Sequence, residues 1–202
     1  MASMSQRLPS RAVSTEQHRW ILSGGLASGK SKVRELVAEA GVVTIDADSI
    51  GHTVIRSDGP AFAQVVGRWP HVAHEGEIDR PSLAAVVFDD PDELAALEGI
   101  THPHIMEVIR TRVAELEGTV VVEIPLLSHG LGEEWRRVVV DCRDEVRLAR
   151  AIQRGMGDED ARARMAAQPA RAEWLAVADL VVPNHGTLEE LAATVEDVIS
   201  VL

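Results

Sequence analysis

The sequence predicts an α/β protein with a three-layer α/β/α architecture, in which helices cover both faces of a five-stranded parallel sheet. The first observation is a regular alternation along the 202 residues between short β-branched runs and segments with helical spacing. The second is that Gly, Pro, Asp or Asn bounds each run, as is typical of buried strands. The expected strands are residues 20–23, 42–45, 119–124, 138–142 and 180–182.

The first strand leads into a glycine-rich loop, which leads into a helix expected over residues 32–38. The segment from Gly24 to Ser31 matches G-x-x-x-x-G-K-S, the phosphate-binding loop, and we call these residues the phosphate loop. Its backbone N–H groups favour a phosphate, Lys30 supplies a compact charge, and the Ser31 hydroxyl is placed to ligate Mg²⁺. Of the 20 Lys and Arg residues, only Lys30 and Lys32 are lysines. A chance glycine-rich turn is the alternative, but the strand and helix around the loop favour nucleoside triphosphate binding.

Two intervals depart from the strand–helix alternation. Residues 51–117 exceed what one crossover helix needs and show helical patterns, notably over 91–116, so we predict a helical insert. Residues 154–174 carry arginines around two glycines, which predicts a lid. The core of a single domain spanning residues 19–202 is then residues 19–50, 118–153 and 175–202, ending in a helix that Thr187 and Glu190 open with a capping box. We interpret residues 1–18 as a disordered extension or an altered start site, without the apolar segment of a secretory signal.

Composition narrows the choice of partners. The net charge of −12 argues against a general nucleic-acid or anionic-membrane surface, and no apolar run reaches the roughly 18 residues of a membrane span. Cys142 is the single cysteine, which excludes a disulfide framework, and its apolar neighbours indicate a buried structural thiol. We therefore expect a cytoplasmic protein, monomeric or weakly homo-oligomeric, with no nucleic-acid or membrane partner.

Seven segments, in order, resemble the dephospho-coenzyme A kinases, which are P-loop enzymes of the nucleoside-monophosphate-kinase type. The resemblance runs from about residue 20 to the C-terminus, and the ordered set is far more specific than the phosphate loop alone. The segments are residues 22–31, Asp46-Ala47-Asp48, residues 76–83 (a G-x-L-D-R-x-x-L-like motif), residues 101–105 (His-Pro-x-Ile), residues 124–127 (Pro-Leu-Leu), Gln153-Arg154, and residues 178–186.

The resemblance implies that the γ-phosphoryl group of ATP passes to the ribose 3′-hydroxyl of dephospho-coenzyme A, the last step of coenzyme A synthesis, with Mg²⁺ as cofactor. It implies that Asp48 accepts the hydroxyl proton while Lys30 and the lid residue Arg154 meet the charge of the transferred group. The residues implied to bind ATP are Gly25, Leu26, Ala27, Ser28, Gly29, Lys30, Ser31, Lys32, Asn184 and Gly186. Those implied to bind the acceptor are Asp48, Arg80, His102 and Leu127.

Most of these residues also have a structural interpretation. Capping a helix is the alternative for Asp48, although Asp46 suits that role better. An ion pair is an equal alternative for Arg80, and a simple turn would use Asn184 and Gly186. His102, which precedes Pro103, is more typical of a residue that holds a turn than of a catalytic one. Ordinary helix-surface pairs are the favoured interpretation of two lid arginines, namely Asp158 with Arg162 and Asp160 with Arg164.

The sequence departs from the family pattern at three places. Ala27 replaces a usual glycine, at a cost of about 1 kcal/mol if the position needs φ > 0. Lys32 replaces a threonine and would either supply charge or face solvent, and Ser128-His129 replaces an aromatic residue and glutamate. Two alternatives to the implied function stay open: a small-molecule kinase of the same fold with another acceptor, and a nucleotide-binding protein that has lost turnover.

Overall fold

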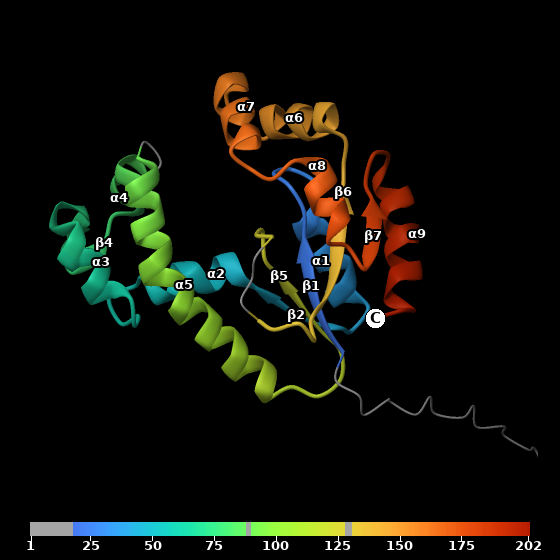
Figure 1. The fold of residues 1–202 in the computed structure, drawn as a ribbon, viewed down its shortest axis with the longest axis horizontal. Coiled ribbons are helices and arrows are strands. Elements are labelled where there is room, and N and C mark those ends of the chain that lie inside the picture. The colour runs from blue at the N-terminus through green and yellow to red at the C-terminus, as the bar shows by residue number, and fades with distance from the viewer. Residues whose placement is uncertain (1–17, 88–89, 128–130) are drawn as a thin grey trace, which may run out of the picture.

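Five parallel strands form the central sheet of the computed structural model, which describes residues 18–87, 90–127 and 131–202. Their spatial order is β2-β5-β1-β6-β7, and every neighbouring pair is parallel (Figure 1). The predicted sheet is therefore confirmed, with strand ends shifted by one or two residues. The strands are β1 (Arg19–Ser23), β2 (Val43–Asp46), β5 (Val120–Glu123), β6 (Arg136–Asp141) and β7 (Leu180–Pro183).

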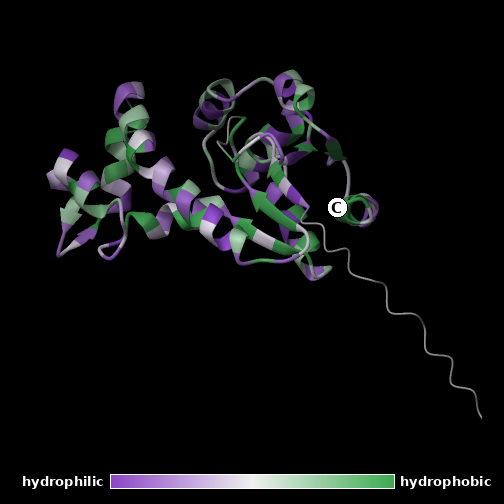
Figure 2. Ribbon diagram, turned by 60° about the horizontal axis from the view of Figure 1, so that its bottom comes forward, coloured by the Kyte–Doolittle hydropathy of each residue, from purple (hydrophilic) through white to green (hydrophobic). Residues whose placement is uncertain are grey.

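Alternate residues of the strands face different helices, which produces the three layers. Trp20 and Leu22 of β1 pack with α1 (Lys30–Glu39) and α9 (Leu188–Ile199), whereas Ile21 belongs to the core on the opposite face. That second core includes α2 (Ala47–Val54) and α5 (Pro91–Ala114). Figure 2 shows predominantly hydrophobic strands between helices that alternate hydrophobic and hydrophilic positions. At the start of α9, Thr187 and Glu190 form the predicted capping box.

The segment after α2 is not wholly helical, which corrects the prediction of a helical insert. It contains α3 (Phe62–Arg68), a short 3₁₀ helix, α4 (Arg80–Val87) and an antiparallel hairpin of β3 (Ala73–His74) and β4 (Glu77–Ile78). Consecutive positive φ angles at Glu75 (51°) and Gly76 (83°) turn the chain between the two strands. Strands of two residues are too short to show a periodic pattern, so no pattern in the sequence predicted them.

Helix α5 runs through His102 and Pro103 without a break, so the expected turn at this dipeptide is wrong while the expected long helix is confirmed. Pro103 has no N–H to donate to the carbonyl four residues earlier, which belongs to Gly99. The helix changes direction about midway along its length (Figure 1), as an internal proline commonly causes.

Three further helices lie above the carboxyl ends of the central strands (Figure 1): α6 (Asp144–Gln153), α7 (Asp158–Ala166) and α8 (Arg171–Ala176). Ligands of open parallel sheets bind at this edge, and the loops leaving β1 and β2 begin there. Among the residues that the structure describes, no helix combines the length and apolar character needed to cross a membrane.

Candidate active site

The phosphate loop joins β1 to α1 in a conformation that its two outer glycines permit. Gly24 has φ 144°, and a β-carbon there would lie 2.6 Å from the carbonyl oxygen of Val140. Gly29 has φ 102° and caps α1, and a β-carbon there would overlap the Asn184 amide. Both glycines are therefore needed for the backbone angle and for the close approach of Val140 and Asn184.

Lys30 is the first residue of α1, and its side chain reaches back over the loop. Its Nζ donates to the carbonyl oxygens of Gly24 (3.0 Å) and Gly25 (3.2 Å). Burial lowers the pKa of the Lys30 ammonium, while the negative charges of Glu123 and Asp48 act in the opposite direction. The loop thus holds a desolvated cation next to backbone donors, which suits an anionic ligand.

Glu123 is a functional candidate that sequence reasoning missed. This buried carboxylate ends β5, where Oε1 accepts from the Ser31 hydroxyl (3.2 Å) and Oε2 accepts from Arg34 Nε (2.7 Å). Arg34 also pairs with Asp46 at 3.4 Å and so connects the ends of β5 and β2. The available signal was a single acidic residue at the end of an otherwise apolar strand, since a buried carboxylate is rare without a role or a partner.

Asp46 and Asp48 take different roles at the end of β2. Asp46 caps α2, where its Oδ1 accepts from the backbone N–H groups of Asp48 (3.0 Å) and Ser49 (3.2 Å). This confirms Asp46 as the capping residue. Asp48 lies in the first turn at the rim of a cavity, and burial first, then the charge of Asp46, raises the pKa of its carboxyl group. A raised pKa strengthens a carboxylate as a proton acceptor.

The cavity beside Asp48 has a volume of about 890 Å³. It brings together the phosphate loop through Leu26, the start of α2 through Ala47 and Asp48, and three wall segments. One wall is α5, the second is residues 124–126 after β5, and the third is α7 with the residues that follow it. The wall side chains are Leu94, Glu98, His102, Ile105, Met106, Ile124, Pro125, Leu126, Asp160, Ala163, Arg164, Ala167, Gln168 and Pro169.

Three residues implied to bind the acceptor lie in different places. His102 lines the cavity from α5. Leu127 is not among the lining residues, and its carbonyl oxygen accepts from Arg137 Nη2 at 2.6 Å, although its neighbour Leu126 does line the cavity. Arg80 begins α4 away from the cavity, with its Nη2 2.6 Å from His52 Nε2. The structure thus brings His102, but neither Arg80 nor Leu127, to the cavity that Asp48 lines.

Arg154 caps the C-terminal end of α6. It is exposed and lines a smaller cleft of about 390 Å³, together with Leu26 and Ala27 of the phosphate loop. Its charge is close enough to lower the pKa of Lys30, after the larger effects of burial and other charges. The structure therefore places both basic side chains around the same loop.

Asn184 binds the backbone of the phosphate loop through its side chain. The residue is buried after β7, where its Nδ2 donates to the Ser28 carbonyl oxygen (2.7 Å) and its Oδ1 accepts from Arg150 Nη2 (3.2 Å). Gly186 is exposed, and its missing side chain leaves room for the carboxylate of Glu190, which caps α9. These contacts give both residues a structural role, and their contact with a nucleotide stays a prediction.

The departures from the family pattern have clear local consequences. Ala27 does adopt a positive φ, 55°, so the strain considered for this position is present. The side chain of Lys32 pairs with Glu35 (3.2 Å) on an exposed face of α1, so it faces solvent, and only its backbone N–H remains available to a phosphate. The third departure, residues 128–129, lies outside the described residues, as do residues 1–17 of the expected N-terminal extension.

Three structural interpretations from the sequence are confirmed. The thiol of Cys142 is buried, and this burial raises its pKa. The two ion pairs expected within residues 154–174 are both present at 2.9 Å, Asp158 with Arg162 and Asp160 with Arg164. Neither pair is buried, so each is an ordinary contact on the surface of α7.

Comparison with known proteins points to one family of kinases. A family model described as dephospho-CoA kinase matches residues 20–190. The dephospho-CoA kinase of Streptomyces avermitilis is 43% identical over 188 residues, covering 88% of this chain and 90% of that protein. The crystal structure of TT1252 from Thermus thermophilus superimposes with a TM-score of 0.76 at 30% identity, covering 92% of this chain and 98% of that one. A dephospho-CoA kinase from Campylobacter jejuni gives a TM-score of 0.64 at 27% identity, covering 91% and 96%.

These matches span most of the chain and agree with the parallel sheet and the P-loop kinase-like fold described above. The chain belongs to the dephospho-CoA kinase family.

Proposed function

We propose that the protein transfers the γ-phosphoryl group of ATP to the ribose 3′-hydroxyl of dephospho-CoA, giving CoA and ADP. The observation that carries this proposal is that Leu26 of the phosphate loop and Asp48 line one cavity of about 890 Å³. A donor held by the loop and an acceptor held in the cavity would therefore meet at the carboxylate, as in-line transfer requires.

The loop would hold ATP through its backbone N–H groups and Lys30. Lys30 Nζ donates to two loop carbonyl oxygens, so the ammonium group already lies over the loop before a phosphate binds. Arg154, which lines a cleft with Leu26 and Ala27 of the loop, would add charge as the phosphoryl group moves. Positioning and charge neutralisation of this kind account for most of the catalysis in phosphoryl transfer.

Asp48 would orient the acceptor hydroxyl and take its proton. The raised pKa of the carboxyl group, caused mainly by burial, makes the ionised form a better base than an ordinary aspartate. The cavity wall next to it is largely apolar, with Leu94, Ile105 and Met106 from α5, and would accommodate the aliphatic part of the acceptor. Residues 51–117 would thus hold the acceptor and residues 154–174 would close over both substrates.

The residues at the start of α1 fit a magnesium ion that arrives with ATP. The Ser31 side chain is exposed and offers a hydroxyl oxygen. Its O–H donates a hydrogen bond to Glu123 Oε1 (3.2 Å), which leaves an oxygen lone pair facing outward. Oxygen ligands of this kind are the ones that Mg²⁺ prefers. When bound, the ion would neutralise charge on the β- and γ-phosphates, and Ser31 would hold it with Glu123 as the supporting residue.

The test is acceptor-dependent release of ADP from ATP and Mg²⁺, with the product identified by mass. Dephospho-CoA is expected to be the preferred acceptor, against adenosine, shikimate and gluconate as competing hydroxyl compounds. A different preferred acceptor would establish another small-molecule kinase of this fold. ATP binding without turnover on any acceptor would instead indicate a nucleotide-binding protein that has lost catalysis.

A further inference from the structure

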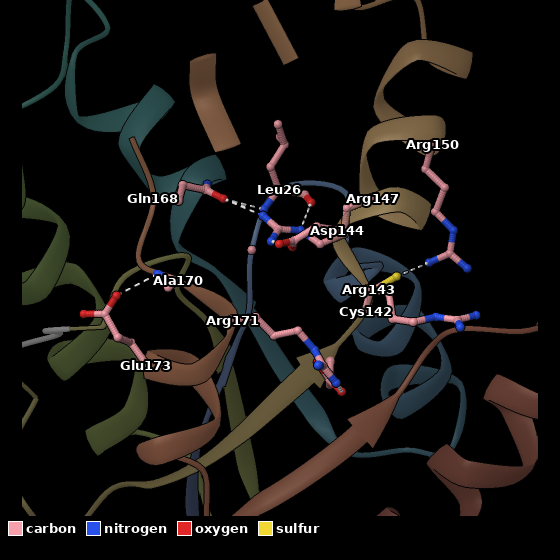
Figure 3. A network of polar contacts seen from close by, with 12 residues as sticks. Leu26, Cys142, Arg143, Asp144, Arg147, Arg150, Gln168, Ala170, Arg171 and Glu173 are labelled. Carbon is pink, nitrogen blue, oxygen red and sulfur yellow. Dashed lines mark hydrogen bonds and ion pairs between the residues drawn. The ribbon is translucent and has the colours of Figure 1, made fainter. Parts of the chain in front are cut away.

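Two side chains from outside the phosphate loop hold both peptide groups of Leu26 (Figure 3). Arg147 of α6 donates from Nε to the Leu26 carbonyl oxygen (2.8 Å), and the Leu26 N–H donates to Gln168 Oε1 (2.7 Å). Arg147 Nη2 donates to the same Gln168 oxygen (3.0 Å). Three hydrogen bonds thus close a ring that we call the Leu26 clamp, and it consists of Leu26, Arg147 and Gln168.

All three nitrogens of the Arg147 guanidinium donate hydrogen bonds to protein acceptors. The residue is 4% exposed, and the third nitrogen of its side chain, Nη1, donates to Asp144 Oδ1 at 2.8 Å. The planar fork also lies against Gly25, where a β-carbon would overlap it. A buried arginine is costly unless such bonds satisfy it, so these contacts indicate a specific role for the fork rather than a general need for charge.

The clamp lies next to the strained residue of the loop. Ala27 has φ 55°, a left-handed angle that disfavours residues with a β-carbon. Such angles persist where the surrounding structure fixes the chain on both sides. Here the clamp fixes Leu26 before Ala27, and Asn184 holds the Ser28 carbonyl oxygen after it (2.7 Å). The Ala27 methyl group also belongs to a small apolar cluster with Ala151 of α6 and Ala161 of α7.

We propose that Arg147 and Gln168 are positioning residues for ATP binding, which hold the phosphate loop in its strained shape at Ala27 and tie that shape to the segment between α7 and α8. They act through the Leu26 peptide groups rather than on the phosphates. The proposal rests on the proposed function only in taking ATP as the ligand of the loop. It explains why the chain tolerates alanine at a position that requires a positive φ.

The first test is ATP affinity, measured by calorimetry on the full chain. Gln168→Leu removes the acceptor shared by Leu26 and Arg147, and ATP is expected to bind about 3- to 10-fold more weakly, as the loss of one or two hydrogen bonds implies. Gln64→Leu is the matched control, since Gln64 lies on α3 and contacts His104. The control is expected to bind ATP like the wild type, and an unchanged affinity in Gln168→Leu would overturn the proposal.

The second test asks whether the clamp acts on the strain. Ala27→Gly relieves the positive φ, so Gln168→Leu in the Ala27→Gly background is expected to weaken ATP binding by less than about twofold. An equal loss in both backgrounds would contradict the link between the clamp and Ala27. A purely structural role would lower the Tm of both Gln168→Leu variants alike without this dependence of ATP affinity on residue 27.

The third test asks whether Arg147 acts through the hydrogen bonds of its guanidinium or only through its positive charge. Arg147→Lys keeps the charge but cannot bond Leu26 and Gln168 together, so ATP affinity is expected to fall as in Gln168→Leu, with the KM for dephospho-CoA unchanged. Wild-type ATP affinity in Arg147→Lys would show that charge suffices and would overturn the proposal. Arg162→Lys, at an exposed pair on α7, is the control. The proposed function fails on acceptor turnover, whereas this proposal fails on ATP affinity, so the two failures are distinguishable.

Discussion

Gly25 of the phosphate loop is held against Arg147, with no room between the two residues for even one methyl group. Its neighbour Leu26 is bonded at both peptide groups, and Ala27 follows with a positive φ. At the scale of single residues, the loop therefore depends on small side chains that let neighbours approach the backbone. The G-x-x-x-x-G-K-S motif identifies the groups that donate hydrogen bonds to a phosphate. The contacts around the loop set the positions of those groups.

Gly25→Ala is expected to displace the Arg147 guanidinium and weaken ATP binding by at least about tenfold, since the added methyl group overlaps a buried fork. Gly67→Ala is the matched control, because Gly67 lies in α3 with nothing within 4 Å of the added atom. Calorimetric titration with ATP compares the two variants. Equal ATP affinity in both would show that Arg147 can leave the loop without consequence.

Lys32→Thr is expected to leave ATP affinity and kcat within about twofold of the wild type. The Lys32 side chain pairs with Glu35 on an exposed face of α1, and such surface pairs contribute little. Steady-state kinetics with varied ATP check this. A severe rise in the KM for ATP would show that Lys32 turns towards the phosphates when nucleotide binds.

At the scale of whole elements, an ion pair docks α8 on the sheet. Arg171, the first residue of α8, bonds both carboxylate oxygens of Asp141, the last residue of β6, at 2.6 Å each. These bonds hold the pKa of Asp141 below its ordinary value of 3.8. The neighbouring α6 carries Arg147, and the residues before α8 include Gln168. Helix α8 is therefore docked next to the two side chains that we propose to position the phosphate loop.

The Asp141 contact predicts a loss of stability in acid. Because the folded pKa is depressed, its contribution is fully present above the ordinary value of 3.8 and is lost as the pH falls through the lower folded pKa. Arg171→Gln is expected to reduce the slope of the free energy of unfolding against pH below about pH 4. Urea unfolding from pH 7 to pH 3 measures this slope. Arg162→Gln, whose partner Asp158 is exposed, is the control, and identical slopes in the two variants would contradict the prediction.

At the scale of the whole molecule, the sheet and its phosphate loop could be predicted because their signals are local. Runs of β-branched residues defined the strands of β5 and β6, and a capping box defined the start of α9. The hairpin of β3 and β4 could not, because two-residue strands have no periodicity. Pro103 was misread because a proline within a long helix and a proline in a turn have the same sequence signal.

The parts of the site that the sequence did not predict depend on contacts between distant residues. Glu123 meets Ser31 and Arg34 from about ninety positions away, and Gln168 meets Leu26 from 142 positions away. No local pattern marks such pairs, since only the folded sheet brings the strand ends and the helices α6, α7 and α8 to one edge. Asp48 and Lys30 were predictable because a motif places each of them at a strand end or a helix start.

The most direct test of the proposed reaction is Asp48→Asn, with kcat measured on dephospho-CoA and ATP affinity measured separately by calorimetry. If Asp48 accepts the hydroxyl proton, kcat is expected to fall by about 100-fold or more, the usual contribution of a general base, while ATP affinity changes by less than about twofold. A kcat within about threefold of the wild type, or an equal loss of ATP affinity, would contradict the role of Asp48 and the cavity it lines as the acceptor site.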